Sequence, residues 1–200
     1  MAFYANAFFY QVVIDPVLSG LRRSVLRHIE SSARVLDVAC GTGALALAMA
    51  NKAGHVTGID LLEEHIAAAQ QTARRRRVDN VAFELRDAED LSCYADDAFD
   101  IAVTSMAVHQ FDADLAVKVL IQMKRVARRL IIADYNHHMP HWWGGSVAWG
   151  IERMAGGDHF RNFRTYMMLG GIHYFIRQAG IRLKTEDIRG GGVFVVVVGE

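Results

Sequence analysis

Between Val35 and Ala50 the chain reads VLDVACGTGALALAMA. The apolar and β-branched residues up to Val38 predict a buried strand, and the small apolar residues from Gly41 onward predict a helix. Gly41 and Gly43 lie in the loop between them, where glycine permits a positive φ and the close approach of a ligand. The first turn of the helix offers unpaired N–H groups to a polar ligand. We therefore expect a nucleotide-like ligand at this loop.

Strand-like runs alternate with longer amphipathic stretches around this unit. The predicted strands are 33–37, 55–60, 81–86, 100–105 and 129–135. The predicted helices are 41–52, 62–76 and 112–127. Strands joined by helices of this length imply right-handed crossovers and a mostly parallel sheet with helices on both faces.

The end of the chain departs from this alternation. Two further strand-like runs, 181–188 and 193–198, are separated only by Arg189 and three glycines. A connection this short cannot be a crossover, so the pair should form an antiparallel hairpin. The predicted fold is α/β: a Rossmann-like seven-stranded, mostly parallel sheet with an antiparallel C-terminal β-hairpin. We expect residues 1–200 to form one domain.

Two segments lie outside the alternating core. Residues 1–30 form an N-terminal segment, helical from about residue 8 to 28, with Pro16 at a break or a first turn. Residues 139–179 form an insertion, predicted to hold two helices separated near Gly156 and Gly157. Both segments are rich in aromatic residues.

Composition disfavours several classes of protein. The 22 basic and 22 acidic residues cancel, whereas proteins that bind nucleic acid through its phosphates usually have a basic excess. The one basic block, Arg74 to Arg77, ends a predicted helix, where it offsets the helix dipole. Cys40 and Cys93 cannot form a disulfide framework, which favours the cytoplasm. No run is long enough for a membrane span.

Acidic residues follow the second and third predicted strands. Asp60 is placed to accept both hydroxyls of a ribose, which would disfavour a 2′-phosphate, or else to cap the helix 62–76. Asp87 is placed to accept a hydrogen bond from an adenine amine, with the N–H of Ala88 facing a ring nitrogen. The alternative for Asp87 is a solvated loop carboxylate.

Together these motifs resemble the class I S-adenosylmethionine-dependent methyltransferases over about residues 33–135. The small bacterial enzymes of ubiquinone and menaquinone biosynthesis are the most similar. The resemblance implies S-adenosyl-L-methionine as cofactor and in-line methyl transfer from its sulfonium. Ala39 replaces a glycine of the commonest family pattern. The implied cofactor-binding residues are Asp37, Ala39, Cys40, Gly41, Gly43, Asp60, Leu61, Asp87, Ala88 and Ser105.

Candidates for a general base or orienting group follow the fourth and fifth strands. They are His109 and Tyr135, at the edge where open α/β sheets bind ligands. For His109 the alternative is packing against the helix that follows. The run His137 to His141 (HHMPH) resembles a metal cluster, but no fixed carboxylate or cysteine pattern accompanies it, so no metal site is predicted.

The candidate substrate-binding residues are Tyr10, His137, His141 and Arg161. The aromatic segments suit a small apolar or aromatic methyl acceptor, although they fit equally well packing against the sheet or a homodimer contact. An exposed helix face is the alternative for Arg161. We predict a small-molecule partner and neither nucleic acid nor membrane.

Three other functions fit parts of the sequence. Gly41, Gly43 and Ala46 also match the fingerprint of a nicotinamide-dependent oxidoreductase. Asp87 and the C-terminal hairpin argue against it. A non-catalytic regulatory protein would keep the cofactor fold, but here the glycines and Asp60 are retained. An RNA methyltransferase would bind nucleic acid in a salt-dependent manner.

Overall fold

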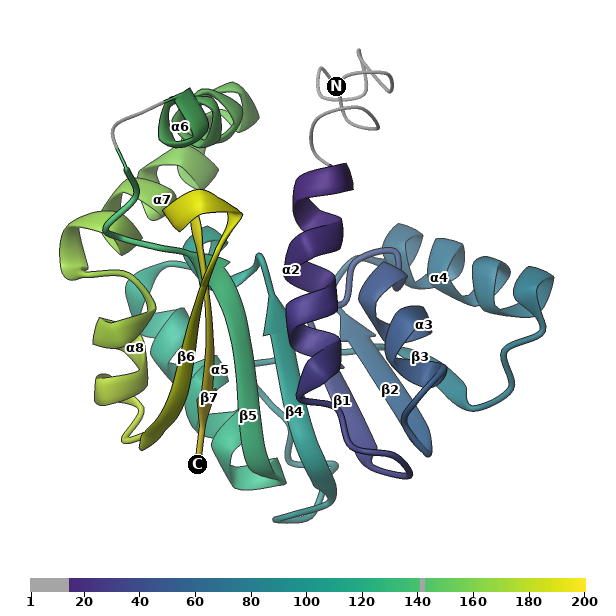
Figure 1. The fold of residues 1–200 in the computed structure, drawn as a ribbon. Coiled ribbons are helices and arrows are strands. Elements are labelled where there is room, and N and C mark those ends of the chain that lie inside the picture. The colour runs from purple at the N-terminus through teal and green to yellow at the C-terminus, as the bar shows by residue number, and fades with distance from the viewer. Residues whose placement is uncertain (1–14, 141–142) are drawn as a thin grey trace.

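The structure is a computed structural model that describes residues 15–140 and 143–200, with a seven-stranded sheet at its centre (Figure 1). The strand order is β3-β2-β1-β4-β5-β7-β6. The strands are β1 (Arg34–Val38), β2 (His55–Asp60), β3 (Val81–Leu85), β4 (Phe99–Ser105), β5 (Ala127–Tyr135), β6 (Leu183–Arg189) and β7 (Phe194–Gly199). The predicted fold class is confirmed.

The first five strands are parallel, as predicted, and β7 runs antiparallel to both β5 and β6. All residues of β7 are buried, whereas most of β6 is exposed at the sheet edge. A buried, continuous run of valines is what a strand covered on both faces requires. The glycine-rich link between the two strands, Gly190–Gly192, is a tight turn in which all three glycines have positive φ.

Helices cover both faces of the sheet. They are α2 (Asp15–Arg27), α3 (Ala44–Ala50), α4 (Glu63–Arg76), α5 (Ala113–Val126), α6 (Trp143–Ala155), α7 (Gly157–Leu169) and α8 (Ile172–Gln178). α2 and α3 pack on one face; α5 lies on the other, against β4 and β5, with α8 packed against α5 (Figure 1). No helix in the described ranges is both long and apolar enough to cross a bilayer.

The insertion differs from its prediction. Two helices were expected between residues 139 and 179, but the described part contains three. The break near Gly156 and Gly157 is confirmed, and a second break occurs at Gly170 and Gly171, where φ is +105° and +61°. Two successive residues with positive φ cannot continue a right-handed helix, so a separate helix starts at Ile172.

The insertion also supplies the largest buried side chains, Phe163 and Tyr166 of α7 and Phe175 of α8. The Tyr166 hydroxyl donates a hydrogen bond to the carbonyl oxygen of Tyr135, at the end of β5, over 2.8 Å. Aromatic burial and this bond hold α7 above the carboxyl ends of the central strands (Figure 1). The insertion is thereby fixed at the edge where the ligand is expected.

Candidate functional site

A cavity of about 660 Å³ lies at the carboxyl ends of the central strands. This volume is within the usual range for small-molecule and cofactor sites. Its walls come from the loops after β1, β2, β3 and β4, together with Leu21 and Arg22 of α2. Most of the predicted cofactor-binding residues line it: Ala39, Cys40, Gly41, Asp60, Leu61, Asp87, Ala88 and Ser105.

The glycine loop has the predicted backbone conformation. Ala39, Gly41 and Gly43 all have positive φ, of 57°, 54° and 76°. The loop is tied to β2, because the Cys40 N–H donates to the Ile59 carbonyl oxygen over 2.9 Å. Apart from its chain neighbours, no atom of the described residues lies within 4 Å of where a Cβ at Gly41 would stand, which leaves room for a ligand at this backbone. Ala39 adopts the left-handed conformation without being a glycine.

Gly43, unlike Gly41, is required for packing. A Cβ at this position would stand 2.6 Å from Cζ of Phe83 and 2.9 Å from Cβ of Ala69. Both distances are far inside van der Waals contact, and the positive φ adds strain for any side chain. Gly43 therefore lets α3 begin close against β3 and α4, and it does not itself line the cavity.

We expect Gly43→Ala to lower the free energy of unfolding by about 1–3 kcal/mol, through overpacking and backbone strain. Urea unfolding measures the change. Gly41→Ala is the control: it introduces the same strain without the clash and should cost less. Equal stability of Gly43→Ala and the wild type would contradict this account of the loop.

Asp37 is a buried carboxylate behind the loop. Its side chain is 2% exposed in the described structure, and Oδ2 has no hydrogen-bond partner there. Burial raises the pKa of Asp37 to about 7; a hydrogen bond from the backbone of Ala46 opposes the rise, and the nearby charge of Asp60 adds to it. An unpaired buried oxygen is costly, which suggests a missing polar partner.

Asp60 holds the loop and the start of α4 together. Its Oδ2 accepts a hydrogen bond from the Gly41 N–H over 2.8 Å, and Oδ1 accepts from the Leu62 N–H over 3.0 Å. His65 Nδ1 lies 3.2 Å from Oδ1. The carboxylate thus lines the cavity and holds Leu62, the N-cap residue of α4, but it does not cap the helix itself, so the capping alternative is wrong. Its contact with a ribose stays a prediction.

Asp87 also lines the cavity, in the turn after β3. One carboxylate oxygen accepts a hydrogen bond from the Glu89 N–H over 2.9 Å, which fixes the turn after β3. Leu61, 66% exposed, also lines the cavity. An exposed leucine beside two carboxylates suits a ligand with one apolar face and polar edges. The adenine contact of Asp87 stays a prediction.

The two catalytic candidates lie in a buried polar cluster beside the cavity. His109 is 1% exposed in η2 (Val108–Gln110), and Tyr135 is 4% exposed. His109 Nδ1 lies 2.5 Å from Oδ1 of Asp134, and the backbone N–H of His109 donates to Oδ2 over 3.2 Å. Neither His109 nor Tyr135 lines the cavity, whereas Ala107 and Gln110, on either side of His109, do.

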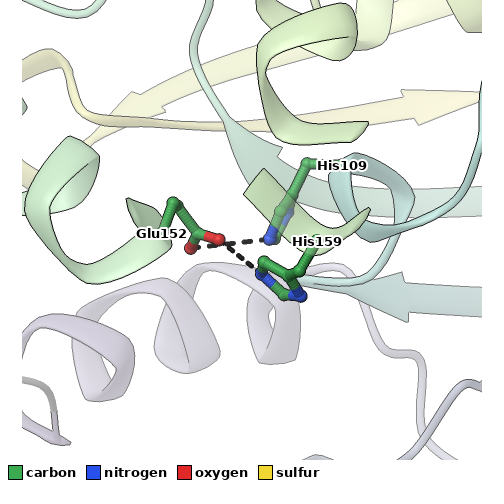
Figure 2. A group of neighbouring side chains, drawn as sticks. All are labelled: His109, Glu152 and His159. Carbon is green, nitrogen blue, oxygen red and sulfur yellow. Dashed lines mark hydrogen bonds and ion pairs between the residues drawn. The ribbon is translucent and has the colours of Figure 1, made fainter. Parts of the chain in front are cut away.

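Glu152 of α6 completes this cluster, although it is far from His109 in sequence. Glu152 Oε1 accepts a hydrogen bond from the Tyr135 hydroxyl over 2.7 Å and lies 3.6 Å from His109 Nε2. Glu152 Oε2 lies 2.5 Å from Nε2 of His159, a residue of α7 (Figure 2). Because Glu152 is only 4% exposed, these contacts replace most of its hydration.

Charges within the cluster counteract the effect of burial. Burial by itself would lower the pKa of His109, but the charge of Asp134, its hydrogen bond and the charge of Glu152 raise that pKa above its ordinary value. Burial would likewise raise the pKa of Glu152, yet the hydrogen bond to His159, the charge of His109 and the Tyr135 hydrogen bond lower it. The surrounding charges therefore favour the cationic form of His109 and the ionised form of Glu152.

The two predicted substrate residues that the structure describes, His137 and Arg161, do not line the cavity. The His137 ring packs against that of His138, with centroids 3.8 Å apart, outside the cavity. Arg161 is exposed and pairs with Asp158 over 2.9 Å, as its alternative interpretation expected. Tyr10 and His141 lie outside the described residues. The substrate roles of these four residues stay predictions.

Sequence reasoning missed several residues of the site. Arg22 lines the cavity from α2, and no partner for its guanidinium is found in the described part of the chain. Gln110 and Phe111 form part of another wall. Arg22 had no recognisable signal, because α2 carries three arginines, Arg22, Arg23 and Arg27, and only the packing of the helix brings Arg22 to the cavity.

Comparisons with known proteins agree with this geometry. Residues 29–154 match the protein family described as "Methyltransferase domain". The chain is 29% identical over 163 residues to "Ubiquinone biosynthesis O-methyltransferase" of Xylella fastidiosa, covering 80% of this chain and 64% of that protein. This chain thus spans just under two thirds of that relative's length.

Solved structures show the same fold. An S-adenosylmethionine-dependent methyltransferase from Aquifex aeolicus superposes with a TM-score of 0.66 at 18% identity, covering 92% of both chains. A protein of Pyrococcus horikoshii superposes with a TM-score of 0.71 at 16% identity, covering 96% of this chain and 97% of that one.

Proposed function

The chain belongs to the class I S-adenosylmethionine-dependent methyltransferases, and we propose that it transfers a methyl group to a small molecule bound beside the cofactor in the cavity. One observation carries the proposal: the cavity of about 660 Å³ is framed by the glycine loop, Asp60 and Asp87. The name of the Xylella relative, "Ubiquinone biosynthesis O-methyltransferase", supports a quinone-like small-molecule acceptor.

The residues present fit the cofactor. The unpaired Oδ2 of Asp37 suits an ammonium group, and Asp60 suits the hydroxyls of a ribose. Asp87 and the Ala88 N–H suit the adenine edge, and Leu61 suits its face. Arg22 suits the carboxylate of the methionine part.

When bound, S-adenosylmethionine supplies a sulfonium methyl that is an intrinsically good electrophile. The protein has to hold the acceptor in line with it and exclude water, which is worth roughly 7–11 kcal/mol of barrier in well-oriented reactions. Met106, Ala107 and Phe111 form an apolar wall suited to this task. η2 places this wall, and His109 anchors η2 through its two contacts with Asp134.

In this proposal His109 and Tyr135 are positioning residues. Both side chains are engaged within the buried cluster, and neither lines the cavity. The apolar wall and the small volume favour an aromatic or quinol-like acceptor over a macromolecule. The basic block Arg74 to Arg76 lies at the C-terminal end of α4, about 20 Å along the helix from the end next to Asp60. Its position therefore gives no support to an RNA acceptor at this cavity.

We expect Asp60→Asn to weaken the binding of S-adenosylmethionine about 10–100-fold, because a charge-assisted acceptor is lost. Isothermal titration calorimetry with S-adenosylmethionine, its demethylated product and NADH measures this. The wild type should bind the first two and not NADH. Asp90→Asn, on an exposed turn outside the cavity, is the matched control and should bind normally. Binding of NADH alone would reassign the chain to the oxidoreductases.

The acceptor class is tested by transfer of a radiolabelled methyl group to small phenols and hydroquinones, and to total RNA, in parallel. Label in one or more small molecules supports the proposal. Label in RNA alone would overturn it while leaving the cofactor assignment intact.

A further inference from the structure

The cluster beside the cavity contains the donor set of a transition-metal site. His109, Glu152 and His159 each offer one ligand atom, and these atoms all lie within 4.8 Å of one another. Figure 2 shows the three side chains pointing toward one another from η2, α6 and α7. Ligand atoms about 2.1 Å from a shared tetrahedral ion stand roughly 3.4 Å apart, so small side-chain shifts bring all three to bonding distance.

The surroundings of the three residues orient them as ligands. The Asp134 carboxylate, 2.5 Å from Nδ1 of His109, directs Nε2 of that ring toward Glu152. The Tyr135 hydroxyl donates to Oε1 of Glu152 over 2.7 Å and fixes its carboxylate. A carboxylate behind a histidine ligand and a hydrogen bond to a carboxylate ligand are common supports around bound metals.

The balance of charge also suits a divalent cation. Asp134 is fully buried and Glu152 is 4% exposed, so two negative charges lie together with little water. With neutral histidines, one divalent ion would neutralise both carboxylates. A bound divalent ion would take over the compensation that His109 provides in the metal-free cluster.

Access and ligand chemistry narrow the identity of the ion. The side chain of His159 is 29% exposed, which leaves an entry path from solvent. Two imidazoles and one carboxylate are typical ligands of Zn²⁺ and of Fe²⁺ or Co²⁺, whereas Mg²⁺ and Ca²⁺ require oxygen ligands. Three protein ligands would leave at least one coordination position open.

We propose that His109, Glu152 and His159 bind one divalent first-row transition-metal ion, with Zn²⁺ as the probe. The site differs from the histidine-rich run His137 to His141 that stood out in the sequence. Bound metal would clamp α6 and α7 to η2, which carries part of the cavity wall. The proposal does not depend on the identity of the methyl acceptor.

The test is calorimetric titration of Zn²⁺ into the full chain after removal of metal with EDTA and exchange into chelator-free buffer. We expect one saturable site per chain, no comparable binding of Mg²⁺, and at least a tenfold loss of affinity in His159→Gln. Asp134→Asn should weaken binding about 10–100-fold through the orientation of His109. Co²⁺ should bind at the same site and show the visible absorption of a histidine-ligated ion, which His159→Gln should abolish.

His173→Gln is the matched control, because His173 also pairs with a glutamate over 2.9 Å and is similarly exposed, but lies outside the cluster. His159 is partly exposed, so its replacement should leave the fold intact, which circular dichroism checks. Absence of a saturable site in the wild type, or equal Zn²⁺ affinity in the wild type and His159→Gln, would overturn the proposal. Loss of binding in His173→Gln but not in His159→Gln would also overturn it.

Discussion

Asp134→Ala will lower the free energy of unfolding by about 3–5 kcal/mol, because it removes the buried partner of His109. The Asp134 carboxylate accepts hydrogen bonds from the backbone N–H groups of His109 and Tyr135 and lies 2.5 Å from the imidazole of His109. None of these groups can turn to water in the variant, because His109 is 1% exposed. Each buried donor left unpaired costs about 1–3 kcal/mol.

Urea unfolding in buffer containing EDTA measures this change without a contribution from bound metal. Asp158→Ala is the control: this carboxylate pairs only on the surface with exposed Arg161, and its loss should change stability by less than about 0.5 kcal/mol. Asp134→Asn keeps one acceptor oxygen, so its loss of stability should lie between those of Asp134→Ala and Asp158→Ala. A cost below about 1 kcal/mol for Asp134→Ala would show that the cluster contributes little to the fold.

A double variant tests whether His109 and Asp134 contribute to stability as a pair. In the double variant His109→Ala and Asp134→Ala, the buried N–H of the imidazole is no longer stranded. The loss of unfolding free energy in the double variant should therefore be smaller than the sum of the losses in the two single variants. Additive costs would mean that the two side chains act independently despite their contact.

The sheet was predictable from sequence because its signals are local. The run of valines in β7 and the VLDV of β1 can hardly be anything but buried strands, and the short glycine link to β7 admits only a hairpin. The glycine loop was predictable for the same reason, since a strand, two glycines and a helix follow one another directly.

The insertion was less predictable because its signals conflict. α8 (IHYFIRQ) has seven residues and no side-chain cap, so its aromatic run reads equally well as part of a longer helix. The separate helix is required by the backbone at Gly170 and Gly171, where both φ values are positive. A pair of adjacent glycines is therefore stronger evidence for a helix break than the low helix propensity of glycine alone indicates.

The cluster could not have been predicted from spacing. His109 stood out because it follows β4, but its partner Glu152 lies in α6, next to Arg153 in sequence, and His159 lies in the next helix. Only the packing of α6 and α7 on the carboxyl edge brings them together. Asp60 illustrates a related limit, because sequence reasoning offered helix capping as its alternative role, whereas its carboxylate bonds the N–H groups of Gly41 and Leu62 and faces the cavity.

We expect Asp37 to lower the stability of the free protein while it contributes to cofactor binding. Burial raises its pKa to about 7, so the folded chain keeps this proton between about pH 4 and 7 while the unfolded chain has lost it. The unfolded state therefore binds fewer protons in this range, and stability falls as the pH rises to about 7 and then levels off. A shift of about three pKa units corresponds to roughly 4 kcal/mol.

Asp37→Asn removes this titration with almost no change in shape. The variant should be more stable than the wild type by about 2–4 kcal/mol at pH 8, and the difference should shrink steadily as the pH approaches 4. Urea unfolding of both proteins at several pH values measures it. Asp158→Asn, on the surface and paired with exposed Arg161, is the control and should not reproduce this pH dependence of the difference. A difference independent of pH would mean that Asp37 is already ionised in the free protein.

The binding of the demethylated cofactor should show the opposite trend. Its ammonium group requires the ionised form of Asp37, so the affinity of the wild type should rise roughly tenfold between pH 6 and 7.5, whereas that of Asp37→Asn should be weak and nearly constant. Calorimetry across this range checks both slopes. If the variant is more stable and still binds with the wild-type slope, then Asp37 is not the ammonium partner. If Asp37→Asn is more stable than the wild type and its affinity no longer depends on pH, then the unpaired oxygen of Asp37 both destabilises the ligand-free fold and recognises the ligand. This is the behaviour expected of a preorganised site.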